Sequence, residues 1–322
     1  MAMPLMSVLV AAYNHERYVE TAIRSVMEQD YPRMELLVID DGSLDETWSV
    51  LLRMRRECER RFENVVFRRQ ENAGTCVTLN RLWKQARGAY VAMLASDDAF
   101  MPGAFSCLTT ALEAHPEAGL AVGVNEWMDE DGNRCYLNAE SQIVHGDGAE
   151  HFETFNDYLG QKTGVAWASP EYGSYAAFLR GNHVVNGYVV RRSAFERILP
   201  YCKDAPLEDY WTHLQLSKLT RYICVQRHTF RYRWHDANTM RRSAHIDEMW
   251  RRTLCWEEEN LIKRRDWGHI GEYVSAHATE LSARHLFGGS LSVFWYATPF
   301  SAIRLLRIFG RTVGARRVLR NG

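Results

Sequence analysis

The sequence predicts an α/β fold in which a mostly parallel sheet is flanked by helices and followed by a helical C-terminal extension. Over the first hundred residues, short apolar runs alternate with stretches of helical periodicity, which is the pattern of βαβ units. Acidic clusters follow two of these runs, and ligands bind at the carboxyl ends of strands in open α/β sheets. The chain has 322 residues, of which 46% are hydrophobic, so it is long enough to bury a core in about two lobes.

The expected elements follow from the spacing of apolar residues. Strands are predicted at residues 7–12, 36–39, 65–67 and 90–94, and the intervening helices contain residues 19–27, 46–52 and 79–86. Ser43 and Glu46 have capping-box spacing before the second helix. Beyond about residue 120 the pattern loosens, with a long loop expected at residues 161–182. Regular structure returns at residues 188–190, 193–199 and 206–219, and the chain from residue 243 is predicted to be helical.

Charge and cysteine content exclude several classes of protein. The net charge is −1, so nothing in the overall balance attracts nucleic acid. The seven cysteines are odd in number and never approach C-x-x-C spacing, which argues against a disulfide framework and against a structural zinc site. The first apolar run follows the N-terminus without a basic region or a cleavage site, so we interpret it as a strand and not as a signal peptide. We therefore expect a cytoplasmic location.

Two acidic clusters lie just after predicted strands. In the first, Asp40 and Asp41 enter a turn, which is typical either of a helix cap or of a carboxylate that binds the base or ribose of a nucleotide. In the second, Asp97 and Asp98 are adjacent. Because neighbouring carboxylates repel each other, a turn that presents both favours a divalent cation bound together with substrate phosphates. A solvated acidic loop is the alternative.

A third cluster lies in the second half of the chain. Glu208 and Asp209 begin an apolar helix, where a carboxylate either is stabilised by the helix dipole or acts as a general base toward a nearby hydroxyl. His235, beside Asp236, is a candidate ligand of a metal or a phosphate, although a single histidine is more often structural.

The order and spacing of these motifs resemble family 2 of the glycosyltransferases. The resemblance covers about residues 5–240 and depends on residues 7–14 (SVLVAAYN), 39–43 (IDDGS), 71–74 (ENAG), 80 (N), 86–90 (ARGAY), 96–98 (SDD) and 208–210 (EDY). It implies the GT-A fold, a Rossmann-like sheet flanked by helices. It also implies inverting transfer of a sugar from a nucleotide diphosphate sugar to an acceptor hydroxyl, as in the synthesis of cell-surface polysaccharides or glycans. A UDP-sugar is the favoured donor, and a glycan or a lipid-linked molecule is the expected acceptor.

The resemblance also implies roles for individual residues. The positions that match the donor-binding residues of the family are Ala11, Tyr13, Asp41, Asn72 and Asp97. Asp98 and His235 match residues that hold the metal cofactor, Mn²⁺ or Mg²⁺, and Asp209 matches the catalytic base. Two places depart from the common pattern: Ser96 replaces an aspartate, and Tyr210 and Trp211 follow Asp209 where many members have a further aspartate.

Two other functions compete with this interpretation. A sugar nucleotidyltransferase would need a Gly-rich, basic phosphate loop after the first strand, whereas residues 13–17 contain no glycine. A catalytically degenerate binding or scaffold subunit would have no need for carboxylates at positions 41, 98 and 209 together.

We expect three parts: a donor-binding half at residues 1–120, a half with the acceptor site and the base at 121–240, and a helical, basic extension at 241–322. After Glu280 the sequence has seven arginines and no acidic residue. Arginines beside aromatic residues favour peripheral contact with the inner face of the cell membrane. The alternative is docking on the acidic catalytic lobe or on a partner subunit.

Overall fold

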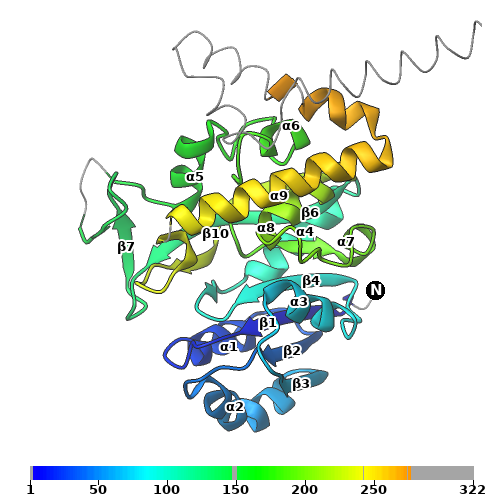
Figure 1. Ribbon diagram of the computed structural model, residues 1–322. Coiled ribbons are helices and arrows are strands. Elements are labelled where there is room, and N and C mark those ends of the chain that lie inside the picture. Colours follow the sequence, from blue (N-terminus) through cyan, green and yellow to red (C-terminus); the bar gives the residue numbers. More distant parts are fainter. Residues whose placement is uncertain (1–2, 147–150, 242, 274, 277–322) are drawn as a thin grey trace, which may run out of the picture. The chain divides into compact units, whose positions relative to one another are not determined.

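The computed structural model describes residues 3–146, 151–241, 243–273 and 275–276. The chain divides into two compact units (Figure 1). The first comprises Met1–Lys203 and Glu208–Arg242, and the second comprises Asp204–Leu207 and Ser243–Gly322. The second unit contains helix α9 (Ser243–Arg264). The segment Asp204–Leu207 is joined to this helix by a hydrogen bond from the backbone N–H of Leu207 to the hydroxyl of Thr253. Most of the basic extension, residues 277–322, lies outside the described part of the chain.

The first unit is built on one sheet with the strand order β3-β2-β1-β4-β9-β6-β10-β5, and β7 and β8 continue from β6. The strands are β1 (Met6–Ala12), β2 (Met34–Asp40), β3 (Asn64–Arg69), β4 (Tyr90–Ala95), β5 (Ala99–Phe100), β6 (Ala118–Met128), β7 (Arg134–Leu137), β8 (Ile143–Val144), β9 (Val189–Arg191) and β10 (Arg221–Arg233). The first four pair in parallel, as predicted. In the second half, β9 runs antiparallel to both β4 and β6, whereas β10 runs parallel to β6. The predicted α/β class is confirmed.

Helices cover this sheet on both faces. The helices of the first unit are α1 (Val19–Met27), α2 (Thr47–Arg61), α3 (Thr75–Trp83), α4 (Ala104–Ala114), α5 (Phe155–Thr163), α6 (Tyr175–Phe178), α7 (Arg192–Phe195) and α8 (Glu208–Leu216), followed by the 3₁₀ turn η1 (Thr239–Arg241). Alternate residues of β1 pack with α1, α2 and α4 in one apolar cluster. Helix α3 packs against β1 and β2 outside that cluster. Burial on both faces explains why the parallel strands are continuous apolar runs.

The start of α2 differs from the predicted capping box. Ser43 donates its hydroxyl hydrogen to Asp40 and accepts the backbone N–H of Asn14, so it does not cap the helix. The side chain of Asp45 instead accepts the backbone N–H of Thr47, where α2 begins. The serine therefore fixes the turn after β2 against the segment after β1, which holds the ends of these two neighbouring strands together.

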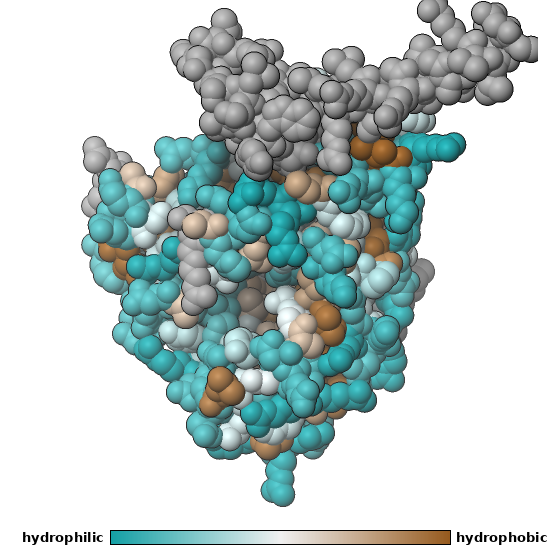
Figure 2. Space-filling model, in the orientation of Figure 1, coloured by the Kyte–Doolittle hydropathy of each residue, from teal (hydrophilic) through white to brown (hydrophobic). Residues whose placement is uncertain are grey.

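Few large apolar side chains are exposed in the described part of the chain. They are Met3, Tyr13, Leu44, Leu52 and Trp267, and the face drawn in Figure 2 is accordingly mostly hydrophilic where it is coloured. Among the described helices, none combines the length and the apolar character needed to cross a membrane.

Gly187 tests how closely the segment before β9 packs on β10. Its φ is +75°, and an added Cβ would lie 2.3 Å from a ring carbon of the fully buried Phe230. We expect Gly187→Ala to lower the free energy of unfolding by about 2 to 4 kcal/mol, because it combines backbone strain with overpacking. Urea unfolding measures the change. Gly164→Ala is the matched control, since φ is +69° there and no atom lies within 4 Å of the added Cβ. Equal losses for the two variants would show that the overlap with Phe230 is relieved without energetic consequence.

Two buried histidines predict a loss of stability in mild acid. The ring of Phe178 is stacked between those of His183 and His213. Burial lowers the pKa of His183 to about 4 and that of His213 to about 3. Below the unfolded-state pKa of about 6.5, the unfolded chain binds protons that the folded chain does not, so stability falls as the pH drops. By pH 5 we expect a loss on the order of 2 kcal/mol for each histidine.

The comparison of urea unfolding at pH 7 and pH 5 isolates this effect. His213→Gln should reduce the pH dependence, whereas the exposed His115→Gln should leave it unchanged. An unchanged pH dependence in the His213 variant would assign the acid sensitivity to other groups.

Candidate active site

The candidate site lies where three strands of the first unit end. The parallel register aligns Ala11 of β1 with Ala95 of β4, so the segments that follow these strands lie beside each other. The end of β10 joins them, because the backbone N–H of Arg233 donates to the Asp98 carboxylate over 2.9 Å. This sheet edge is where ligands bind in open α/β folds.

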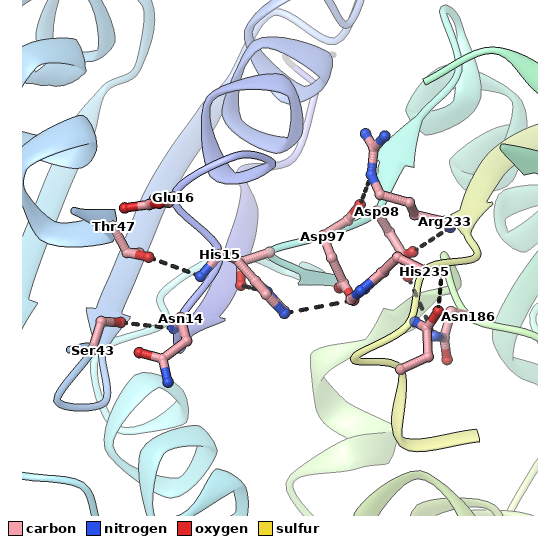
Figure 3. Close-up of polar contacts among 12 residues, drawn as sticks. Asn14, His15, Glu16, Ser43, Thr47, Asp97, Asp98, Asn186, Arg233 and His235 are labelled. Carbon is pink, nitrogen blue, oxygen red and sulfur yellow. Dashed lines mark hydrogen bonds and ion pairs between the residues drawn. The ribbon is translucent and has the colours of Figure 1, made fainter. Parts of the chain in front are cut away.

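A carboxylate and two imidazoles meet at this edge. Oδ2 of Asp97 lies 3.1 Å from Nε2 of His235 and 3.8 Å from Nε2 of His15. Figure 3 shows the Asp97 carboxylate between the two rings. The side chain of His235 is 3% exposed, and those of His15 and Asp97 are 22% and 14% exposed, so the cluster is shielded but open to a ligand.

Each member of this cluster is held in place by a further contact. The backbone N–H of His15 donates to the hydroxyl of Thr47 over 2.8 Å, and its Nδ1 lies 2.7 Å from the hydroxyl of Ser96. Burial lowers the pKa of His15, although the Asp97 charge opposes the shift. Burial acts to raise the pKa of Asp97, but the hydrogen bond from His235 and the nearby histidines bring it below the usual value. At neutral pH the cluster therefore offers an ionised carboxylate and a neutral His15, which is the state that ligates a metal.

Asp98 has a different environment from Asp97. One of its oxygens accepts the backbone N–H of Arg233, and the other lies 3.5 Å from the side-chain nitrogen of Asn186. Burial, followed by the charge of Asp97, raises the pKa of Asp98 well above its usual range. The guanidinium of Arg233 donates to the main-chain oxygens of Asp97, Asp129 and Glu130. Asp98 and Arg233 together thus fasten β10 to the loop after β4.

The residues of this edge fit a divalent cation. Among the described acidic, histidine and cysteine side chains, the group within ligand reach comprises His15, Asp97 and His235, whose ligand atoms all lie within 4.8 Å of one another. Carboxylate and imidazole are suitable ligands for Mn²⁺ and related ions. Asp98 was expected to be the metal carboxylate, but the structure does not bring it into this group. Its neighbour Asp97 was expected to contact the donor, but this geometry favours Asp97 as the candidate carboxylate ligand of the cation.

Four of the residues expected to bind the nucleotide lie at the ends of β1 and β2 and between β3 and α3. Asp41 is 5% exposed, and its carboxylate accepts hydrogen bonds from the side chain of Gln70 and from the backbone N–H groups of Ala73 and Gly74. The acidic turn and the residues 70–74 are thereby joined. Tyr13 is 43% exposed at the end of β1, Ala11 is half-buried, and Asn72 is exposed. Gly42 has a positive φ of +78°, and a Cβ there would lie 2.7 Å from the backbone nitrogen of Asn72.

The expected catalytic base lies in the first turn of α8. One oxygen of Asp209 accepts a hydrogen bond of 2.9 Å from the side-chain nitrogen of Asn182. Burial raises the pKa of Asp209, although its hydrogen bonds oppose the shift. Burial and the neighbouring Asp209 raise the pKa of Glu208 to about 8, so at neutral pH the pair mainly carries one negative charge.

Two residues of this arrangement were not singled out from the sequence. His15 approaches Asp97 across 82 positions of the chain, and Asn182 approaches Asp209 across the 27 positions that separate them. A pocket of about 310 Å³ opens beside the cluster and is lined by residues 14–18, 45, 130 and 235–237. Neither Asp41 nor Asp209 lines this pocket.

Comparison with known proteins places this geometry in a family. The profile described as Glycosyl transferase family 2 matches residues 7–183, which is more than half of the chain. Among relatives, the putative teichuronic acid biosynthesis glycosyltransferase TuaG of Bacillus subtilis is 39% identical over 152 residues. That match covers 46% of this chain and 58% of TuaG, so the chain matches about three fifths of that relative's length.

Solved structures share the fold. A mannosyltransferase from Pyrobaculum calidifontis, in complex with GDP-Man and Mn²⁺, superposes with a TM-score of 0.57 at 16% identity, covering 92% of this chain and 79% of that one. TarS of S. aureus, residues 1–349 with UDP-GlcNAc, gives a TM-score of 0.53 at 15% identity and covers 84% and 79% of the two chains. The resemblance noted from the sequence is confirmed: the chain belongs to glycosyltransferase family 2.

Proposed function

We propose that this protein transfers a sugar, with inversion, from a nucleoside diphosphate sugar to a hydroxyl of a growing cell-surface glycan. The observation that carries the proposal is the grouping of Asp97 with His15 and His235 at the carboxyl ends of the strands, where the turn after β2 contacts the segment after β1 through Ser43 and Asn14. Family membership and the name of the relative TuaG support the reaction class and its place in cell-surface polysaccharide synthesis.

Donor binding is assigned to the turn after β2 and the end of β1. Asp41, Ala11, Tyr13 and Asn72 would surround the nucleoside, with the exposed ring of Tyr13 available to the base. A UDP-sugar stays our favoured donor. The related folds bind UDP-GlcNAc in one case and GDP-Man in another, so fold alone does not select the base.

Asp97 and His235 would hold the divalent cation. Asp98 would help to position them, because it joins the loop after β4 to the end of β10 through the backbone N–H of Arg233. The side chains of Asp97 and His235 offer oxygen or nitrogen at the sheet edge, whereas the Asp98 oxygens face protein donors. A bound Mn²⁺ or Mg²⁺ supplies positive charge that stabilises a departing diphosphate. The Mn²⁺ complex of the mannosyltransferase supports a metal for this fold.

Asp209 would act as the general base. As the acceptor oxygen forms a bond to the anomeric carbon, its proton passes to the Asp209 carboxylate, and the bond from that carbon to the diphosphate oxygen breaks with its electron pair leaving on the diphosphate. Asn182 holds one oxygen of the carboxylate in a fixed orientation. Glu208, with its raised pKa, is mainly protonated at neutral pH and does not compete for this role.

The alternative functions have less support. A scaffold subunit would not require a carboxylate–imidazole group at the sheet edge together with a buried base on α8. A lipid-linked acceptor and contact of the basic tail with an anionic membrane surface stay predictions, because residues 277–322 lie outside the described part. Flotation on anionic liposomes, with and without the residues after Gly289, tests that contact.

Comparison of Asp97→Asn with Asp98→Asn tests the cation site. We expect Asp97→Asn to reduce Mn²⁺ affinity at least tenfold and to abolish metal-stimulated turnover, because it removes the charged ligand. Asp98→Asn keeps an oxygen that can accept the Arg233 N–H, so Mn²⁺ affinity should change by less than about threefold. Calorimetric titration with Mn²⁺ measures both. The reverse order of the two effects would return the ligand role to Asp98.

The pair Asp209→Asn and Glu208→Gln tests the base. The first substitution keeps the size and removes the proton acceptor, so kcat should fall roughly 100-fold or more with little change in donor affinity. The second should leave most of kcat intact. Steady-state kinetics with a nucleotide sugar and a hydroxyl acceptor measure these values. If Glu208→Gln gives the larger loss, Glu208 is the base and the assignment to Asp209 is wrong.

A further inference from the structure

His15 occupies a place from which it can bind the same cation as Asp97 and His235. We propose that Nε2 of His15 is a third protein ligand of the cation, and that Ser96 orients the ring for this role. The inference rests on the proposed function, because it extends the cation site described there.

The two distances from Asp97 to the histidine nitrogens differ in what they indicate: one is that of a hydrogen bond, and the other fits two ligands of one ion. The 3.1 Å between His235 and Asp97 is a hydrogen bond, whereas the 3.8 Å between Nε2 of His15 and Oδ2 of Asp97 is too long for one. Two ligands that each lie about 2.1 Å from one ion are at most about 4.2 Å apart. The spacing between His15 and Asp97 is therefore compatible with an ion bound by both.

The other ring nitrogen of His15 has the partner that a metal-bound histidine requires. Nδ1 lies 2.7 Å from the hydroxyl of Ser96, which is 1% exposed. Histidine ligands usually hydrogen-bond through the nitrogen that does not bind the metal, and the Ser96 hydroxyl can accept from a protonated Nδ1 and so hold the ring in this orientation. With Nδ1 engaged by Ser96, Nε2 points toward Asp97. Ser96 replaces an aspartate of the common family pattern. The serine hydroxyl has no charge, and in this position it would orient the neutral ring of His15.

The surroundings of His15 do not explain this orientation by packing alone. Its ring contacts those of Tyr18 and His235 at centroid distances of 6.0 and 5.9 Å. Such contacts would be preserved with the ring turned over, but carbon atoms would then take the places of both ring nitrogens, and the Ser96 contact would be lost. The backbone N–H of His15 is in turn held by Thr47 at the start of α2. The ring is thus fixed from both its backbone and its side chain.

A site with two imidazoles and one carboxylate should select among metals. Mg²⁺ favours oxygen ligands and an octahedral shell with several waters, whereas imidazole suits the transition metals. We therefore expect the protein to bind Mn²⁺ and Co²⁺ more tightly than Mg²⁺, and the difference should depend on His15.

His15→Asn is the informative variant. The asparagine amide nitrogen can replace Nδ1 toward Ser96, but nothing replaces Nε2, so the support is kept and the ligand is removed. We expect Mn²⁺ affinity, measured by calorimetry without donor, to fall about tenfold or more, and Mg²⁺ affinity to fall less. Pulsed electron paramagnetic resonance on bound Mn²⁺ should detect two histidine nitrogens in the wild type and one in the variant. His115→Asn, at an exposed histidine outside the cluster, should match the wild type in both measurements.

The outcomes separate this inference from the proposed cation site. If His15→Asn keeps wild-type Mn²⁺ affinity and both nitrogen signals while Asp97→Asn loses them, His15 is not a ligand and the site of Asp97 and His235 stands. If the wild type shows no histidine-bound Mn²⁺, both assignments are wrong. Circular dichroism checks that His15→Asn is folded. Should it unfold, Ser96→Ala replaces it, because loss of the orienting hydroxyl should still weaken Mn²⁺ binding severalfold.

Discussion

The hydrogen bond from the backbone N–H of Arg233 to the Asp98 carboxylate is the interaction on which the candidate site most depends. It joins β10 to the loop after β4, two segments that are far apart in the sequence. The guanidinium of the same arginine donates to three main-chain oxygens and lies 4.7 Å from the ring centre of Tyr18. Asp97 precedes one partner and His235 follows the other by two residues, so the position of both depends on this contact.

This arrangement explains why adjacent aspartates differ in chemistry. Asp98 points into the protein, where burial favours its neutral form, while Asp97 points toward two histidines that favour its charged form. The same alternation separates Asp40 from Asp41. Asp40 is fully buried beside Ser43 and Arg69, whereas Asp41 binds the 70–74 segment. In each pair, the two carboxylates therefore contact different segments of the chain.

Much of this architecture could be predicted from the sequence, because the parallel strands are continuous apolar runs and the acidic turns follow them directly. Family membership could be predicted as well, since it depends on the order of motifs. Strand β10 could not, because it carries charged residues and its pairing with β6 contains register shifts that break any simple alternation. The different surroundings of Asp97 and Asp98 could not be predicted either, since the side chains of these sequence neighbours point in opposite directions. The positions of His15 beside Asp97 and of Asn182 beside Asp209 depend on tertiary contacts that no local motif encodes.

The protonation of Glu208 reduces the negative charge at the start of α8. With a pKa of about 8, this side chain is uncharged below mildly alkaline pH, so α8 begins with one negative charge where its sequence shows two. A diphosphate that approaches this unit would meet less repulsion in that state. As the pH rises through 8, Glu208 loses its proton, and the second negative charge increases the repulsion of nearby anions. The charge that the start of α8 presents to a nearby anion therefore changes with pH around this value.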